Sequence, residues 1–140
     1  MKQLTATFVF VIALTGCSGK QTTQNSNGRV PFAPTLEPLI GEWASGGELA
    51  LIVERDGDVI VVRNPENDTW RFDISEIATD GTSVMFTQRH YVSDGSDHPF
   101  NGVPCKCTIS PIPNDADSLT YKMTSSQLPD GESDIMKRLR

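Results

Sequence analysis

The chain is poor in positive charge. Its 140 residues include 12 lysines and arginines against 18 aspartates and glutamates, which gives a formal net charge of −6 at pH 7. Binding to the phosphate backbone of a nucleic acid needs a basic surface, and electrostatic docking on anionic lipid needs basic clusters. The charge balance therefore argues against nucleic acid as a partner and against a basic membrane-binding face.

The sequence also lacks the motifs of common enzyme classes. It contains no G-x-S-x-G, no H-E-x-x-H and no glycine-rich phosphate loop. His90 and His98 lie close to Asp94 and Asp97 along the chain, a combination suited to acid–base chemistry. These aspartates, however, belong to a Gly/Ser/Pro-rich loop, where aspartate is favoured because it hydrogen-bonds the backbone of turns. We therefore expect a protein that is not an enzyme, with no catalytic residues and no cofactor.

No segment shows a helical period of useful length, and apolar residues instead alternate with polar ones. Asp56-Gly57 and Asp80-Gly81 are turn signals between such alternating runs. The runs that predict strands are Leu39 to Trp43, Glu48 to Arg55, Asp58 to Arg63, Thr69 to Ile74, Thr82 to Tyr91, Val103 to Ile109, Leu119 to Met123 and Asp134 to Leu139. The pattern predicts an all-β meander of about eight short antiparallel strands.

A meander of this kind has two unpaired edges, and closure into a barrel removes them. We therefore predict a small antiparallel up-and-down β-barrel of about eight strands. The interior of such a barrel is filled by side chains or holds one small ligand. Large aromatic side chains expected to point inward are the candidate ligand-binding residues: Trp70, Phe72, Phe86 and Tyr121. Because these side chains are bulky, they are also able to fill much of the interior themselves.

The first residues form an apolar segment that is too short to span a membrane as a helix. Lys2 precedes the 11-residue run Leu4 to Leu14, whereas a spanning helix needs about 20 apolar residues. A charged start, a short apolar stretch and small residues at the end are typical of a secretory signal. Leu14-Thr15-Gly16-Cys17 resembles the lipobox of bacterial lipoproteins. The alternative is an ordinary secretory signal followed by a coincidental cysteine.

The lipobox resemblance implies that residues 1–16 are a lipoprotein signal peptide and that Cys17 becomes a lipidated N-terminus. It also implies a diacylglyceryl thioether and an N-acyl chain, and two or more chains hold a protein stably on a bilayer. Ser18 replaces the aspartate that favours inner-membrane retention in enterobacterial lipoproteins. The expected location is therefore the cell envelope, with the protein anchored by lipid to the outer membrane.

The segment after Cys17 has the composition of a tether. Ser18 to Pro38 is rich in Gly, Ser, Thr, Asn, Gln and Pro, and few of its residues are able to bury apolar surface. We therefore expect a signal peptide over 1–16, a lipidated cysteine and disordered linker over 17–38, and a folded domain over 39–140. About 100 residues suffice for one domain with one core.

Gly41-Glu42-Trp43 resembles the G-x-W opening of lipocalin-like (calycin) barrels, in which the tryptophan closes the floor of the barrel. Asp94 to Gly102 resembles a D-G-x-x-(H/Y)-P loop of small bacterial lipocalin-like domains. Those families often end with an arginine that covers the tryptophan, and Arg138 stands in the matching place. The resemblance spans about residues 39–140 and implies structural roles for Trp43 and Arg138, with a stacking contribution of about 0.5–2 kcal/mol. The domain is shorter than a true lipocalin, so we expect a shallow cup.

Cys105 and Cys107 lie two residues apart on a predicted strand, so both thiols face the same side. If Cys17 is lipidated, they form the remaining pair in an oxidising compartment. A disulfide across one intervening residue is geometrically tense and therefore easily reduced. The other interpretations are inert burial and a metal site with His90 or His98. A lone C-x-C lacks the second half of a zinc pattern, and we expect no metal ligands.

Three functions remain open from the sequence. The first is an envelope lipoprotein whose barrel binds a small apolar or amphipathic ligand. The second is a module that binds an envelope protein, such as an inhibitor or immunity-type factor. The third is redox or metal handling through Cys105 and Cys107. The first is preferred, because a barrel supplies an enclosed apolar interior.

Overall fold

The computed structural model describes residues 23–25, 29–65, 70–92, 94 and 97–140. All described strands belong to one sheet, and a 3-10 helix, η1, covers Pro34–Leu39. The strands are β1 (Thr23–Asn25), β2 (Arg29–Pro31), β3 (Gly41–Ser45), β4 (Glu48–Asp56), β5 (Val59–Arg63), β6 (Trp70–Thr79), β7 (Val84–Val92), β8 (Pro104–Ile112), β9 (Asp115–Ser125) and β10 (Leu128–Arg138). No helix in this part of the chain is long and apolar enough to cross a membrane.

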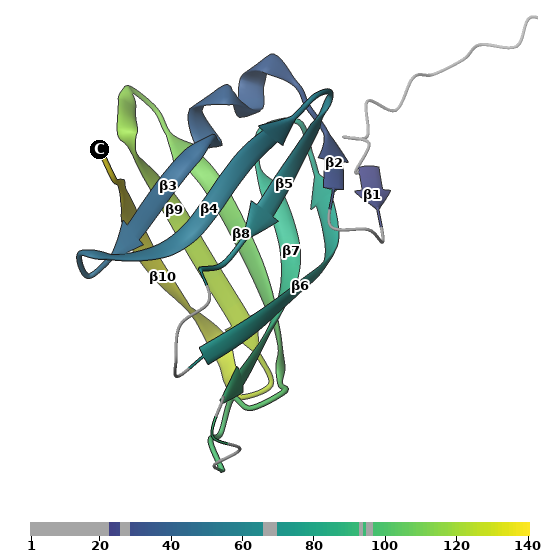
Figure 1. Ribbon diagram of the computed structural model, residues 1–140, viewed down its shortest axis with the longest axis vertical. Coiled ribbons are helices and arrows are strands. Elements are labelled where there is room, and N and C mark those ends of the chain that lie inside the picture. Colours follow the sequence, from purple (N-terminus) through teal and green to yellow (C-terminus); the bar gives the residue numbers. More distant parts are fainter. Residues whose placement is uncertain (1–22, 26–28, 66–69, 93, 95–96) are drawn as a thin grey trace, which may run out of the picture.

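The sheet curls into a nearly closed barrel (Figure 1). Its strand order is β1-β6-β7-β8-β9-β10-β3-β4-β5-β2, and every paired neighbour is antiparallel. β10 pairs with β3, which joins the end of the meander to its start. Among the described residues, β5 and β6 do not pair with each other; instead β2 pairs with β5 and β1 pairs with β6. The prediction of an all-β, up-and-down antiparallel barrel is confirmed.

Alternation of apolar and polar residues explains most strand positions. On β4 and β5, Leu51, Val53, Ile60 and Val62 are buried in the barrel core. The predicted turn at Gly57 joins these two strands, and Gly57 has φ +62°, a conformation that glycine adopts without steric cost. The strands at the end of the meander are longer than the apolar pattern predicts, because ladder pairing continues through polar residues.

The folded part starts earlier than the expected boundary at Leu39. β2 and all but the last residue of η1 lie within residues 17–38, for which the composition predicts a disordered linker, and Val30 and Leu36 have no exposed surface. The guanidinium of Arg55 also lies over the Phe32 ring, 3.8 Å from its centre. These isolated apolar side chains pack against the core because the meander leaves part of the barrel interior uncovered. The average composition of the segment does not reveal this.

One end of the barrel is closed by Trp43. This side chain is fully buried, and its Nε1 donates a hydrogen bond to the carbonyl oxygen of Leu39 at 2.8 Å. The Arg138 Cζ atom lies 4.4 Å from the centre of the Trp43 ring, so the contact expected from the lipocalin-like resemblance is present. Arg138 also donates hydrogen bonds to three carbonyl oxygens, those of Pro38, Ile40 and Ala116. The N-terminal and C-terminal parts of the barrel are therefore joined at this end.

Candidate functional site

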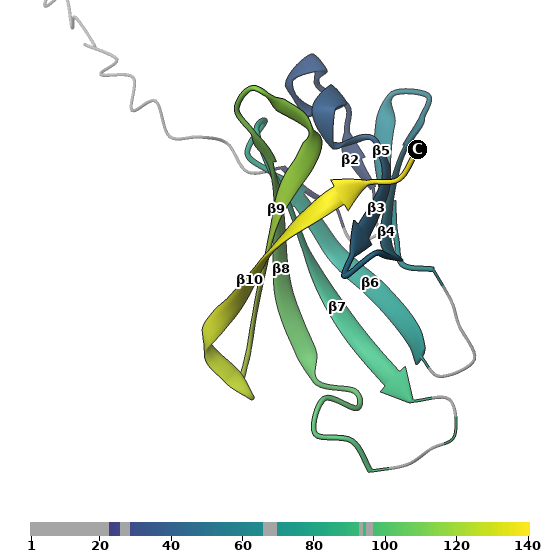
Figure 2. The same ribbon diagram turned by 90° about the vertical axis from the view of Figure 1, so that its left-hand side faces the viewer.

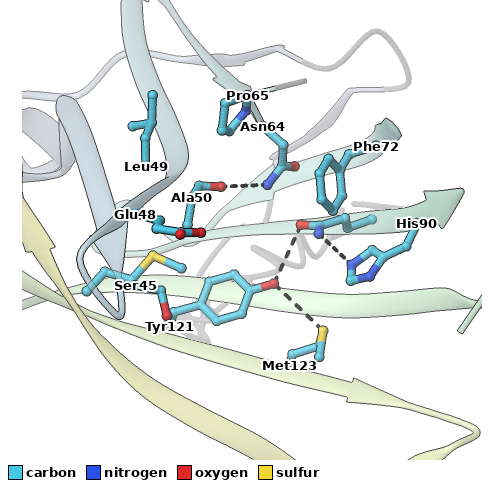
Figure 3. A pocket seen from close by; sticks show the side chains of 12 residues that line it. Ser45, Glu48, Leu49, Ala50, Asn64, Pro65, Phe72, His90, Tyr121 and Met123 are labelled. Carbon is cyan, nitrogen blue, oxygen red and sulfur yellow. Dashed lines mark hydrogen bonds between the residues drawn. The ribbon is translucent and has the colours of Figure 1, made fainter. Parts of the chain in front are cut away.

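The opposite end of the barrel is open and uneven. Strands β6 to β10 extend beyond β3, β4 and β5 at the end away from η1 (Figures 1 and 2). A cavity of about 290 Å³ lies where the short and long strands meet (Figure 3). Its apolar lining consists of Leu49, Ala50, Pro65, Phe72, Met123 and Met136. Its polar lining consists of Ser45, Glu48, Asn64, Gln88, His90 and Tyr121.

A line of polar side chains crosses the cavity floor. The amide Nε2 of Gln88 lies 2.6 Å from His90 Nε2, and the Tyr121 hydroxyl lies 3.5 Å from the amide oxygen of Gln88 (Figure 3). Because an amide nitrogen only donates, His90 Nε2 is the acceptor and the ring is neutral. Burial lowers the pKa of His90, and His98 lowers it further by repulsion. The cavity therefore presents a neutral imidazole.

A β-bulge turns an acidic side chain toward this cavity. Trp43 pairs with Leu51 and Ala44 pairs with Leu49, so Ala50 has no partner on β3. A one-residue shift exchanges the two faces of a strand. With uninterrupted alternation, Glu48 would lie on the face opposite Leu51. After the bulge, its carboxylate lies among the cavity-lining side chains (Figure 3).

Two further carboxylates come from β10. Glu132 pairs with Met123 and Asp134 pairs with Tyr121, and directly opposite residues of an antiparallel pair share one face. Since Met123 and Tyr121 line the cavity, Glu132 and Asp134 lie on its side of the sheet. They line an adjoining hollow of about 300 Å³ that shares Tyr121, Met123 and Met136 with the cavity. Ser45 Oγ donates a hydrogen bond of 2.5 Å to Asp134, which joins β3 to β10 at the rim.

Asn64 contributes an unused hydrogen-bond acceptor. Its Nδ2 donates to the carbonyl oxygen of Ala50 at 2.9 Å, which fixes the orientation of the amide. Its Oδ1 is then the single buried side-chain oxygen or nitrogen without a hydrogen-bond partner in the described part of the chain. An unpaired buried acceptor costs about 1–3 kcal/mol.

The structure brings only part of the predicted site together. Phe72 and Tyr121 line the cavity. Trp70 lies beside it, with its ring 4.9 Å from the ring of His98 and 6.0 Å from that of His90. Phe86 is buried in the core and is not among the cavity-lining residues. Cys17 lies outside the described residues.

Cys105 and Cys107 are free and buried. The Sγ of Cys107 lies 3.1 Å from the Tyr121 hydroxyl. Burial raises the pKa of the Cys107 thiol to about 12 and also raises the pKa of Cys105. The thiolate is the reactive and metal-binding form of cysteine, and the raised pKa of both thiols favours the protonated form. Among the described residues, no group of three or more His, Cys, Asp or Glu side chains is arranged to hold a metal ion.

Sequence reasoning missed Gln88, Asn64 and Glu48. The sequence contains a signal for Gln88, because this residue continues the two-residue alternation of the inward-facing Val84 and Phe86 into the cavity. Asn64 follows the last residue of β5, where no strand pattern applies. Comparisons of the chain with protein-family models, curated proteins and solved structures find no match. The function is therefore inferred from the geometry of the open end.

Proposed function

We propose that this protein binds a small amphipathic molecule in the cavity at the open end of the barrel. Ligand sites are typically concave, mostly apolar and equipped with a few convergent polar groups. This cavity is concave and places apolar Phe72, Met123 and Met136 beside polar Gln88 and His90, with apolar and polar lining residues in equal number. Its volume of about 290 Å³ lies just below the usual range of about 300–1,000 Å³, which favours a short-chain ligand.

The test is to fill the cavity. We expect Ala50→Trp to weaken the binding of n-octanol, measured by titration calorimetry, by about tenfold or more, because the added ring occupies the space of the ligand. Ile135→Trp is the matched control: Ile135 is 56% exposed on β10, outside the cavity-lining set, so the same side chain added there leaves affinity unchanged.

Ser45→Phe provides a second way of blocking the cavity if Ala50→Trp does not fold, as judged by circular dichroism. All variants are made in the full chain carrying Cys17→Ser, so that binding elsewhere on the chain is the same in each. Absence of binding of n-octanol, n-octylammonium and octanoate to the unblocked chain would contradict the proposed function. Equal affinity in blocked and unblocked chains would contradict the proposed location.

We also propose that Cys17 anchors the protein by lipid to the outer membrane. The support is the lipobox-like Leu14-Thr15-Gly16-Cys17, the short apolar segment before it and the absence of an aspartate at position 18. We expect Cys17→Ser to abolish incorporation of radioactive palmitate and to release the protein from the outer-membrane fraction. Cys105→Ser is the control that keeps the label, because this thiol is buried. Label that persists in Cys17→Ser would refute the anchor.

A further inference from the structure

We infer that the ligand of this cavity is a cationic amphiphile, a small amine with an apolar tail. This inference rests on the proposed function and adds the sign of the charge. Three observations carry it: the carboxylates that surround the cavity, the position of the β8 and β9 lysines on the outer face of the sheet, and the hydroxyl and aromatic groups of the cavity lining.

The charged groups that surround the cavity are all acidic. Glu48 lines the cavity, and Glu132 and Asp134 line the adjoining hollow. No lysine or arginine is among the described residues that line either space. The three carboxylates come from two strands that β3 connects, so they approach the opening from different sides. An ammonium group at the rim is attracted by each of them, whereas a carboxylate head group is repelled.

The lysines of β8 and β9 lie on the outer face of the sheet, away from the cavity. On β9, Lys122 stands between Tyr121 and Met123, which line the cavity, so its side chain projects from the outer face. On β8, Lys106 forms an ion pair with Glu76 at 2.5 Å, and neither residue lines the cavity. At the open end, acidic side chains therefore face the cavity, and the lysines of β8 and β9 face away from it. The acidic character of the rim is not merely the negative charge of the whole chain.

The uncharged groups of the cavity also suit an amine. An ammonium group has three donors and no acceptor, which suits the hydroxyl oxygen of Ser45 in the cavity lining. The faces of Phe72 and Tyr121 attract a cation that lies over them, and the thioether of Met123 packs against an apolar tail. His90 adds no opposing charge because its ring is neutral. The same cavity thus offers an acceptor and aromatic faces to a cationic head group.

The experiment compares three probes that share an eight-carbon tail. Calorimetric titration with n-octylammonium, n-octanol and octanoate at pH 7 isolates the contribution of the head group. Each exposed ion pair contributes little by itself, but three carboxylates act together, so we expect n-octylammonium to bind about tenfold tighter than n-octanol, and octanoate to bind weakest. Added salt reduces the affinity for n-octylammonium and leaves that for n-octanol unchanged.

The matched variants remove charge from one face at a time. We expect Glu132→Gln combined with Asp134→Asn to lower the n-octylammonium affinity about fivefold and to leave the n-octanol affinity unchanged. Asp73→Asn combined with Glu42→Gln removes two charges from the outer faces of β6 and β3 and serves as the control for net charge. Equal n-octylammonium and n-octanol affinities would overturn the cationic inference while leaving the proposed function intact. An equal effect of the outer-face variant would also overturn it, because the rim would then have no special role.

Discussion

Replacing Trp43 by alanine is expected to lower the free energy of unfolding by about 3–5 kcal/mol, the usual cost of truncating a large buried aromatic. The side chain has no exposed surface, and its removal also takes away the donor that pairs with the Leu39 carbonyl. Small domains are stable by only about 5–15 kcal/mol. The variant therefore loses a large share of the total free energy of unfolding, and the closed end of the barrel depends on the Trp43 ring.

Urea unfolding followed by far-ultraviolet circular dichroism measures this change. Trp70→Ala is the control, because the other tryptophan of the chain is half-buried beside the open end and its loss is expected to cost about 1 kcal/mol. If both substitutions cost the same, Trp43 would not be the main residue closing the barrel.

Gly41→Ala is expected to destabilise the protein by about 3 kcal/mol, because two costs combine. Gly41 has φ +151°, a backbone conformation that residues with a side chain rarely adopt. A Cβ atom there would also overlap Nη1 of Arg138 and lie 3.3 Å from its Cζ. The arginine would have to leave the Trp43 ring and the carbonyl oxygens of Pro38 and Ile40.

A double-mutant cycle separates the two costs. In an Arg138→Ala background, Gly41→Ala should cost only the backbone strain, so the two substitutions should be strongly non-additive in urea unfolding. Gly46→Ala is the control for strain alone: Gly46 also has positive φ, with open space around the added atom, and we expect a loss of about 1 kcal/mol. Additive losses at Gly41 and Arg138 would show that the close approach has no energetic importance.

The architecture could be predicted from the sequence because it follows from local patterns. The alternation along Glu48 to Arg63, interrupted by Asp56-Gly57, corresponds directly to β4, a turn and β5. Closure followed from the need to pair strand edges. Trp43 and Arg138 were identified through the lipocalin-like resemblance, and the structure places them in contact. These features depend on short sequence separations or on a motif.

The chemistry of the cavity could not be predicted in the same way. The bulge opposite Trp43 and Ala44 depends on how β3 and β4 are held by the rest of the sheet, and it alone turns Glu48 inward. The burial of Val30 and Leu36 likewise depends on surface that distant strands leave uncovered. For Phe86, the alternation of apolar and polar residues correctly indicates an inward side chain. Whether that position lies in the core or in the cavity depends on its depth in the barrel.

The missing pairing between β5 and β6 gives the barrel a seam. In a fully closed barrel, strand number and shear fix the radius, so the interior cannot widen without loss of ladder hydrogen bonds. β5 ends at Arg63 and β6 begins at Trp70, and within the described residues these two strands share no ladder hydrogen bonds. Spreading these strands changes the diameter of the open end while every existing strand pair stays intact. Among the described residues, the ladder hydrogen bonds alone therefore do not fix the width of the open end, and the volume of about 290 Å³ belongs to one such width.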